Sequence, residues 1–313
     1  MSQNIKTNIL TIIVTYNRKD LLLECLTAIN SSLQKTDVLV IDNNSTDGTK
    51  EMIENLKLNI ETKLIHINTG ANLGGAGGYN YGVREAIKLS ASASHKYKYF
   101  YLMDDDTIIK PNALKVLIDT ASKLNDKFGF LSSKALWKDG SICKTNVQRR
   151  AVARRINDFT SPLVEVDYAS FVSLLIKEED AVTLGLPIKE FFIWSDDLEY
   201  TRRFSKKEKS YLVNESVVVH KCTENIGVDI TREKDTKRIE RYKYIYRNDV
   251  YTFKKEGIRG ILFLLIRFIY HMFKIIFIAP KKFDKIKTMI SSHIDGFSFN
   301  PQIEYEGKIN DNN

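Results

Sequence analysis

Three consecutive carboxylates, Asp104, Asp105 and Asp106, follow the aromatic and apolar segment YKYFYLM. Carboxylates this close raise one another's pKa unless a cation lies among them. A divalent metal bound by one or two carboxylates together with substrate phosphates removes that repulsion. We therefore expect a divalent metal site at this position. The alternative is a solvated turn in which Asp106 or Thr107 caps the following helix.

A second acidic cluster lies in the segment WSDDLEYTRRF, which contains Asp196, Asp197 and Glu199. One of these carboxylates can serve as a general base, and the preceding Trp194 and FFI can partly desolvate it and tune its pKa. The alternative is a capped helix whose acids pair with Arg202 and Arg203 on the next turn.

A single histidine, His220, ends the apolar run VVV. A lone histidine is more often structural than a metal ligand. Because a metal is already inferred from the aspartates, His220 becomes the candidate nitrogen ligand for it.

The segment NLGGAGGYNYG, from Asn72, is rich in glycine but lacks the G-x-G-x-x-G spacing of dinucleotide-binding loops. Glycines at a helix N-terminus let backbone amides approach phosphate or sugar closely, and the alternative is a flexible connector. The segment NNSTDGTKEMIE approximates a calcium loop, but Asn43 stands where an aspartate is wanted and a strand precedes it. Asp42 and Asn44 fit better as hydrogen-bonding groups for a base edge or ribose.

These clusters need a scaffold, and the first hundred residues alternate between strand and helix patterns. Strands are expected at 8–16, 37–42, 62–67 and 97–103, with helices in 19–33, 45–56 and 68–89. This alternation predicts an α/β fold with a mostly parallel sheet and right-handed crossovers. Ligands bind beyond the carboxyl ends of such strands. Residues 15–17, 42–44, 72–78 and 104–106 should therefore meet at one nucleotide-sized crevice.

Composition narrows the partners. The net charge of +8 favours anionic partners such as nucleotide phosphates or an acidic lipid surface. Basic residues concentrate in the last third without an aromatic-rich recognition motif, which argues against nucleic-acid binding. Cys25, Cys143 and Cys222 are far apart, which argues against a disulfide framework or a zinc knuckle and suits a reducing compartment. We expect no signal peptide, because MSQNIKTNIL lacks a charged leader before a long apolar core.

The segment 257–287 is apolar except for a narrow stripe of Arg267, His271 and Lys274, followed by further lysines at 281, 282, 285 and 287. An in-plane interfacial helix whose cations face anionic headgroups explains this pattern. The alternative is a helix that packs onto the catalytic domain or a second subunit. A membrane-spanning helix is not expected, because about 18 uninterrupted apolar residues occur nowhere.

Seven segments, in this order and spacing, resemble family 2 glycosyltransferases of the GT-A fold, and within them bacterial galactofuranosyltransferases and their rhamnosyltransferase relatives. They are TIIVTYNR, VIDNNSTDGT, NLGGAGGYNYG, LMDDDT, WSDDLEYTRRF, VVVHK and YIYRND, spread between Thr11 and Asp249. With this resemblance we expect a Rossmann-like GT-A catalytic domain at 1–230 and a helical, membrane-associating region at 231–313. The protein is then expected in the cytoplasm, peripheral on the inner face of the cell membrane.

The resemblance also implies roles for single residues. The implied metal ligands are Asp104, Asp106 and His220, holding Mn²⁺ or Mg²⁺. The implied donor-binding residues are Thr15, Asp42, Asn72, Gly74, Gly75, Asp104 and Asp105. Asp197 corresponds to the base, and Asp196 is its alternative because Ser195 departs from the family pattern. Glu199 would position the acceptor, and Trp194 would pack near the acceptor sugar.

The implied reaction is transfer of a sugar with inversion, for which the best candidate is galactofuranose from UDP-galactofuranose. The acceptor would be a hydroxyl of a lipid-linked glycan in cell-surface polysaccharide synthesis. One alternative is a rhamnosyltransferase that uses a dTDP-sugar. Another is a non-catalytic glycan- or membrane-binding protein with a degenerate transferase fold. A phosphatase-type nucleophilic aspartate fits poorly, because it is expected on the first strand of its fold.

Overall fold

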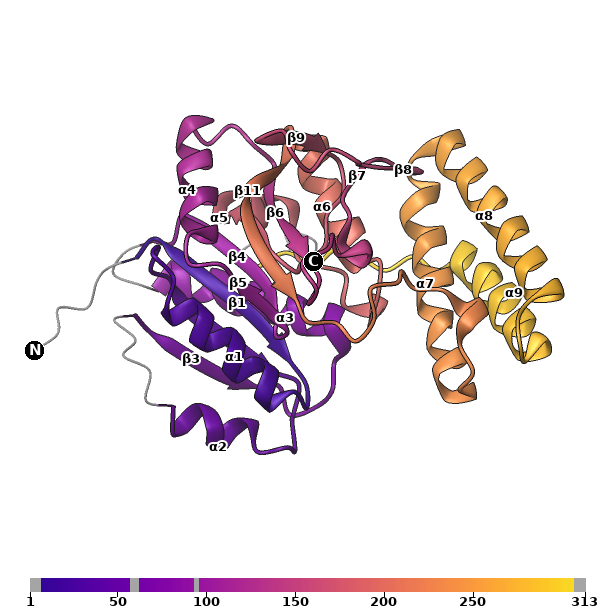
Figure 1. Ribbon diagram of the computed structural model, residues 1–313, viewed down its shortest axis with the longest axis horizontal. Helices are drawn as coiled ribbons and strands as arrows, with labels where there is room; N and C mark the ends of the chain where they lie inside the picture. Colours follow the sequence, from indigo (N-terminus) through magenta and orange to yellow (C-terminus); the bar gives the residue numbers. More distant parts are fainter. Residues whose placement is uncertain (1–6, 57–61, 93–95, 307–313) are drawn as a thin grey trace, which may run out of the picture.

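The computed structural model describes residues 7–56, 62–92 and 96–306. Residues 1–6, which carry the expectation about a leader, lie outside the described residues. An α/β body surrounds one central sheet, and three long helices near the C-terminus lie beside it (Figure 1).

Four parallel strands form the first half of the sheet, in the spatial order β3-β2-β1-β4. Each is rich in β-branched or aromatic residues, which suits strands covered on both faces. They are β1 (Ile9–Thr15), β2 (Asp37–Asp42), β3 (Leu64–Asn68) and β4 (Tyr99–Asp104). The four strands expected in this region are confirmed, and their carboxyl ends lie at the same edge.

The second half of the sheet is mixed. Strand β10 (Leu174–Lys177) runs antiparallel between β4 and β6 (Phe130–Leu136). Strand β11 (Ser210–His220) lies parallel to β6, and β5 (Thr107–Ile109) closes that edge. Strand β9 (Leu163–Val166), which pairs antiparallel with β11, precedes β10 in the chain. The residues between them leave the sheet and bury aromatic side chains in the core.

Helices cover both faces of the sheet, each burying an apolar face against it. One face packs against α1 (Lys19–Asn30), α2 (Thr49–Glu54) and α4 (Ala113–Lys123). The other packs against α3 (Gly74–Ser92), α5 (Glu178–Leu184) and α6 (Asp196–Lys207). Short elements complete the body: β7 (Arg149–Ala151), β8 (Arg154–Arg155), η1 (Lys144–Asn146), η2 (Lys189–Phe191) and η3 (Ile230–Arg232).

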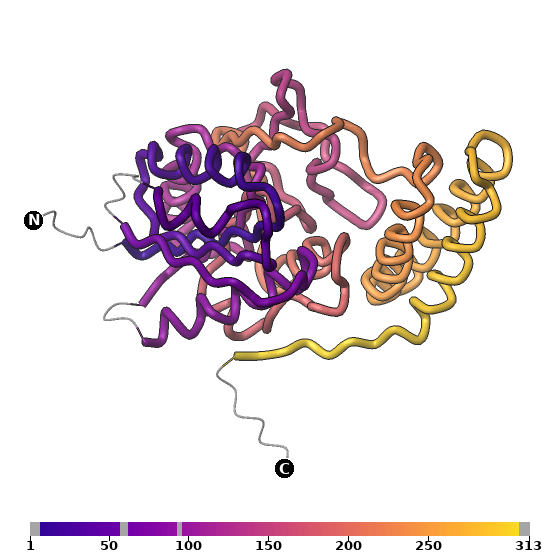
Figure 2. Tube along the Cα trace, turned by 90° about the horizontal axis from the view of Figure 1, so that it is seen from below, coloured from indigo at the N-terminus to yellow at the C-terminus, as the bar shows by residue number. Residues whose placement is uncertain are grey.

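Three helices follow the body: α7 (Thr236–Lys254), α8 (Gly257–Phe277) and α9 (Lys282–Ser298). They share an apolar cluster that includes Ile239, Tyr246, Ile275 and Met289. After α9 the chain runs back along one side of the body, at the bottom of Figure 2. There Arg84 of α3 pairs with Glu304 at 2.8 Å and with Glu306 at 3.1 Å. The tail therefore fastens the helices to the body at a second place.

Helix α8 confirms the expected helix but not its orientation. Arg267 pairs with Asp249, Lys274 pairs with Asp229 at 3.1 Å, and His271 lies 2.9 Å from the Tyr246 hydroxyl. The prediction that these cations face headgroups is therefore wrong: the stripe faces α7 and the body, because Asp249, Asp229 and Tyr246 are polar partners there. Lys285 is also buried, donating to the Thr231 carbonyl oxygen.

The outer face of α8 is consequently apolar. Apart from Arg259 near the start of the helix, its exposed side chains are Ile258, Ile261, Leu262, Leu265, Ile266, Ile269, Tyr270, Phe273, Ile276 and Phe277. By length and composition alone, Gly257–Phe277 could cross a membrane, contrary to the expectation that no segment of the chain could.

Candidate active site

Strand pairing brings the predicted metal ligands together. Asp104 ends β4, and β5 begins three residues later, pairing antiparallel with the end of β11 so that His220 lies opposite Thr107. The Lys221 amide donates to the Asp106 carbonyl oxygen at 2.9 Å, which fixes the two segments side by side. The potential ligand atoms of Asp104, Asp106 and His220 all lie within 4.8 Å of one another. This arrangement can hold a divalent metal.

The three aspartates have unequal electrostatic environments. Burial, and then the charge of Asp106, raise the pKa of Asp104, and burial raises the pKa of Asp105 to about 7. Burial also acts to raise the pKa of Asp106, but the hydrogen bond and charge of His220, together with the charge of Arg18, outweigh it, so that this pKa lies below its usual value. His220 Nε2 lies 3.0 Å from Asp106 Oδ1. The cluster thus holds more negative charge than its burial favours, and a cation stabilises it.

Arg18 is a functional candidate that the sequence analysis missed. Its Nη1 lies 3.1 Å from Asp105 and 2.9 Å from Asp106, while half of its side chain remains exposed. The segment TYNR, which places this cation directly after β1, was the available signal. Because β1 and β4 are parallel neighbours, a residue after one meets residues after the other.

Thr15 and Asp42 lie at the same sheet edge, opposite each other in the pairing of β1 and β2. Thr15 donates to Asp105 at 2.8 Å. Asp42 is completely buried and accepts from the Ser45 amide at 2.8 Å. A further missed residue, Tyr79 of α3, donates its hydroxyl to Asp104 at 2.7 Å. The predicted convergence of strand ends is therefore seen, with internal partners already present for these side chains.

The glycine-rich segment begins helix α3 rather than forming a loose connector. Gly74 has a φ of +72°, and a Cβ there would lie 2.2 Å from the Phe192 carbonyl oxygen. Asn72 accepts from the Gly74 amide at 2.9 Å, which holds the turn. Gly75 has open space where its Cβ would be. Gly74 therefore permits close backbone contact, and Gly75 leaves its surface open.

The loop before α6 carries the second acidic cluster in a strained backbone. Phe192, Trp194 and Ser195 all have φ near +60°, at 61°, 66° and 66°. Non-glycine residues adopt this region only when surrounding contacts hold them there. Two side chains of α7 supply such contacts: Asn248 donates to three carbonyl oxygens of the loop, and Asp249 accepts from the Ser195 hydroxyl at 2.5 Å. The segment YIYRND contained both, but no role was assigned to them.

A cavity of about 500 Å³ opens beside this loop, and Asp197, Trp194, Arg149, Tyr246 and Arg267 are among its lining residues. Burial raises the pKa of Asp197 to about 7, which is suitable for a base near neutral pH. The charge of Asp104 contributes to raising the pKa of both Asp196 and Asp197. The two acidic clusters therefore lie near each other, the first at the metal-ligand set and the second beside the cavity.

The other two acids of the second cluster do not line this cavity. Asp196 is buried beside Asp197, and burial raises its pKa well above the usual value. The Glu199 carboxylate pairs with Arg203 at 3.0 Å and is nearly fully buried. Of the three, Asp197 has access to a molecule in the cavity.

Comparison with known proteins finds similar sequences for part of the chain. Residues 11–131 match the family described as Glycosyl transferase family 2. A relative from Campylobacter jejuni, the GalNAc(5)-diNAcBac-PP-undecaprenol beta-1,3-glucosyltransferase, is 28% identical over 147 residues. This match covers 42% of the chain and 45% of the relative, so less than half of the relative is matched.

Solved structures show the same fold. They include GalNAc-T7 with UDP, GalNAc and Mn²⁺ (TM-score 0.58, 13% identity, 80% of this chain and 48% of that chain). A mannosyltransferase from Pyrobaculum calidifontis in complex with GDP-Man and Mn²⁺ has a TM-score of 0.55, with 14% identity over 95% of this chain and 77% of that one. TarS 1-349 of S. aureus has a TM-score of 0.51 and 14% identity, and the match covers 93% of this chain and 72% of that one. The expected GT-A fold is confirmed, and the match to the family model covers residues 11–131, which include the first aspartate cluster.

Proposed function

We propose that the chain is an inverting, metal-dependent glycosyltransferase that moves a sugar from a nucleotide donor to a hydroxyl of a lipid-linked glycan. One observation carries this proposal: the metal-ligand set of Asp104, Asp106 and His220 lies near Asp197. Asp197 lines the cavity, and its pKa is raised to about 7. The match to a glucosyltransferase that acts on an undecaprenol-linked substrate supports the class of acceptor.

The donor set fits a hard divalent ion, because two carboxylate oxygens and an imidazole suit Mn²⁺ and also accommodate Mg²⁺. When bound, such an ion stabilises the negative charge that grows on the leaving diphosphate. The half-exposed guanidinium of Arg18 pairs with Asp106, one of these ligands, and with Asp105, and it is placed to contact that diphosphate. Thr15, Asp42, Asn72, Gly75 and Asp105 are proposed to surround the nucleotide and donor sugar.

Asp197 takes the proton from the acceptor hydroxyl in the cavity, and Trp194 packs against the acceptor sugar. The hydroxyl oxygen forms a bond to the anomeric carbon as the bond from that carbon to the diphosphate breaks, so the configuration inverts. Asp196 and Glu199 act indirectly, because neither residue lines the cavity and the Glu199 carboxylate pairs with Arg203. Base assistance of this kind is worth about 10²–10⁴-fold in rate.

For the donor we propose UDP-galactofuranose, with a dTDP-sugar such as dTDP-rhamnose as the alternative. Incubation of the purified protein with Mn²⁺, a panel of sugar nucleotides and lipid-linked acceptors, followed by product mass, tests both. Asp197→Asn is the inactive control. Asp119→Asn, which changes an exposed aspartate on α4, is the control that should stay active. If donors bind with and without metal equally well and no sugar is transferred, the non-catalytic reading replaces this proposal.

We also propose that residues 1–230 are the catalytic domain and 231–313 a membrane-associating region, which keeps the protein on the cytoplasmic face of the cell membrane. The support is the apolar outer face of α8, together with exposed Lys282 and Lys287 on α9 that can meet anionic lipid. The alternative is that this face covers a second copy of the chain.

Single charges on that face distinguish the two. Ile266→Glu should reduce flotation with anionic vesicles, whereas Leu33→Glu, at an equally exposed position (66%) outside these helices, should not. If vesicle binding is unchanged and Ile266→Glu instead turns a dimer into a monomer in light scattering, the face is a subunit interface.

A further inference from the structure

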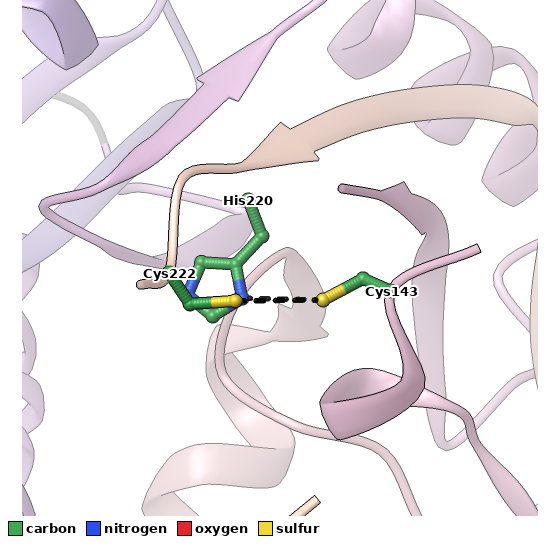
Figure 3. A group of neighbouring side chains, drawn as sticks. All are labelled: Cys143, His220 and Cys222. Atoms are coloured by element: carbon green, nitrogen blue, oxygen red, sulfur yellow. Dashed lines mark hydrogen bonds between the residues drawn. The ribbon is translucent and has the colours of Figure 1, made fainter. Parts of the chain in front are cut away.

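Two cysteines far apart in the sequence meet beside His220. Cys143 follows β6, and Cys222 lies two residues after the end of β11. The Cys143 sulfur lies 3.9 Å from the Cys222 sulfur and 3.6 Å from His220 Nδ1 (Figure 3). All three potential ligand atoms lie within 4.8 Å of one another. The wide spacing along the chain, which argued against a cysteine metal motif, conceals this group.

We propose that Cys143, Cys222 and His220 Nδ1 form a site for a thiophilic divalent cation, Zn²⁺ in the cell, separate from the carboxylate site on the other side of the imidazole. Tetrahedral Zn²⁺, with Zn–S bonds of about 2.3 Å and Zn–N bonds of about 2.0–2.1 Å, separates two sulfurs by roughly 3.8 Å and a sulfur from a nitrogen by roughly 3.6 Å. The observed distances of 3.9 Å and 3.6 Å match those separations.

The surroundings hold the three side chains in place. The Trp137 indole donates to the Cys222 carbonyl oxygen at 3.0 Å. Asn225 links the two segments, accepting from the Lys144 amide at 2.7 Å and donating to the Ile142 carbonyl oxygen at 3.0 Å. Asn146 Oδ1 lies 3.0 Å from the Cys143 sulfur and 2.7 Å from His220 Nδ1, so it or a water can supply a fourth ligand. The site therefore needs little rearrangement to close around an ion.

Binding releases the two thiol protons and the proton that Nδ1 carries while the imidazole of His220 is charged, so that Zn²⁺ is held by two thiolates and one neutral imidazole. The third cysteine provides a contrast within the chain. Cys25 is buried in the apolar core beneath the sheet, and the contact recorded for its sulfur is the Asp104 carbonyl oxygen at 3.9 Å. A thiophilic ion should therefore select the pair and leave Cys25 unaffected.

The site has a consequence for the reaction, which rests on the proposed function. A neutral imidazole has one nitrogen that can bind a metal and one that carries a hydrogen. When Nδ1 binds Zn²⁺, Nε2 carries the hydrogen and donates it to Asp106 Oδ1, 3.0 Å away. His220 is then no longer available as a ligand for the ion at the carboxylate site. Thiophilic and hard cations should therefore oppose each other through one side chain.

Cadmium provides the direct test, because thiolate-bound Cd²⁺ has an ultraviolet charge-transfer band that does not depend on activity. Titration of the fully reduced protein, with its thiols counted first, should saturate this band at one equivalent. Cys25→Ser should leave the titration unchanged, and Cys143→Ser and Cys222→Ser should each weaken binding by about tenfold or more. The proposal is overturned if the folded wild type shows no band, or if both pair variants keep it. Because Cys222 is only partly buried, its variant keeps the test valid should Cys143→Ser fail to fold.

A second measurement separates this site from the proposed function. Free Mn²⁺, read by its electron paramagnetic resonance signal, should be released from the wild type as Cd²⁺ is added. Asp104→Asn should lose Mn²⁺ binding but keep the Cd²⁺ band. If Mn²⁺ never binds the wild type, the proposed metal-dependent function fails while the cysteine site stands. If Mn²⁺ and Cd²⁺ bind together with unchanged affinities, the opposition between them is overturned.

Discussion

Asn248 of α7 holds the backbone of Trp194 in place: its side-chain nitrogen donates to the Trp194 carbonyl oxygen at 3.0 Å. The same nitrogen lies 3.0 Å from the Phe191 and 3.2 Å from the Ile193 carbonyl oxygens. This helix lies outside the expected catalytic domain, yet it fixes the strained turn that directly precedes α6 and Asp197.

Asn248→Ala should therefore affect both stability and rate. Leaving buried carbonyl groups without a donor is expected to lower the free energy of unfolding by about 1–3 kcal/mol. The relaxed loop should also lower kcat, while donor binding at the far side of the site is largely kept. Urea denaturation and isothermal titration with UDP measure the two effects. Asn55→Ala, which removes an exposed amide on the first turn after α2, should change neither.

The pH dependence of the reaction should follow Asp197. Burial raises its pKa to about 7, so below that pH the free protein carries a protonated, inactive base. The logarithm of kcat/KM should rise with pH and level off above about 7. Glu199→Gln should keep this profile, because the Glu199 carboxylate pairs with Arg203 outside the cavity. If the protein stays folded between about pH 5 and 8 and the profile is flat over that range, the role of Asp197 is contradicted.

The same shift predicts that removing the base stabilises the fold. A carboxyl group whose pKa is higher in the folded than in the unfolded chain binds its proton more tightly when folded. Its unfavourable effect is therefore absent below about pH 4 and fully present above about pH 7.

Asp197→Asn should accordingly raise the free energy of unfolding at pH 8 by about 1–2 kcal/mol and change it little at pH 4. The increase at pH 8 is smaller than the full pKa shift implies, because Asp197 lines the cavity. Thermal unfolding at both pH values measures this difference. Asp119→Asn on the exposed face of α4 should show no such dependence. A variant that is equally destabilised at both pH values would show that Asp197 contributes packing instead.

Metal binding should stabilise the wild type, because Asp104, Asp105 and Asp106 are compensated in the free protein only by the described cations Arg18 and His220. At about 100 times its dissociation constant, Mn²⁺ should add about 2.7 kcal/mol to the free energy of unfolding. Differential scanning calorimetry with and without Mn²⁺ tests this. Asp104→Asn should abolish the increase, and Asp119→Asn should retain it.

Two adjacent glycines offer a matched pair of substitutions. Gly74→Ala forces a side chain into a φ of +72° and against the Phe192 carbonyl oxygen, so it should cost at least about 2 kcal/mol of stability. Gly75→Ala meets open space in a helix and should add about 0.5–1 kcal/mol. If Gly75 borders the donor, its variant should nevertheless bind UDP more weakly. Unchanged UDP affinity in the stable Gly75→Ala protein would remove this residue from the donor site.

Sequence patterns predicted the parts of the site that depend on local burial. The buried run before Asp104 and the apolar run before His220 each predict a strand that ends at the polar residue. Because parallel strands end at the same edge of a sheet, these residues are expected close together. Patterns could not reveal partners that meet only in the folded chain. Asn248 and Trp194 are 54 residues apart, and Cys143 and Cys222 are 79 apart. The stripe on α8 showed the same limit, because the periodicity that placed Arg267 on one face could not say what that face would meet.

The ion pair between Arg267 of α8 and Asp249, which in turn accepts from Ser195, has a practical implication for anyone seeking a water-soluble version of this protein. Deleting helix α8 would remove Arg267, the counter-charge of the buried Asp249, whose carboxylate contacts the turn before Asp197. An inactive truncation would then say nothing about whether lipids are required. Replacing only the outward-facing side chains of the helix keeps that support intact while removing the exposed apolar surface.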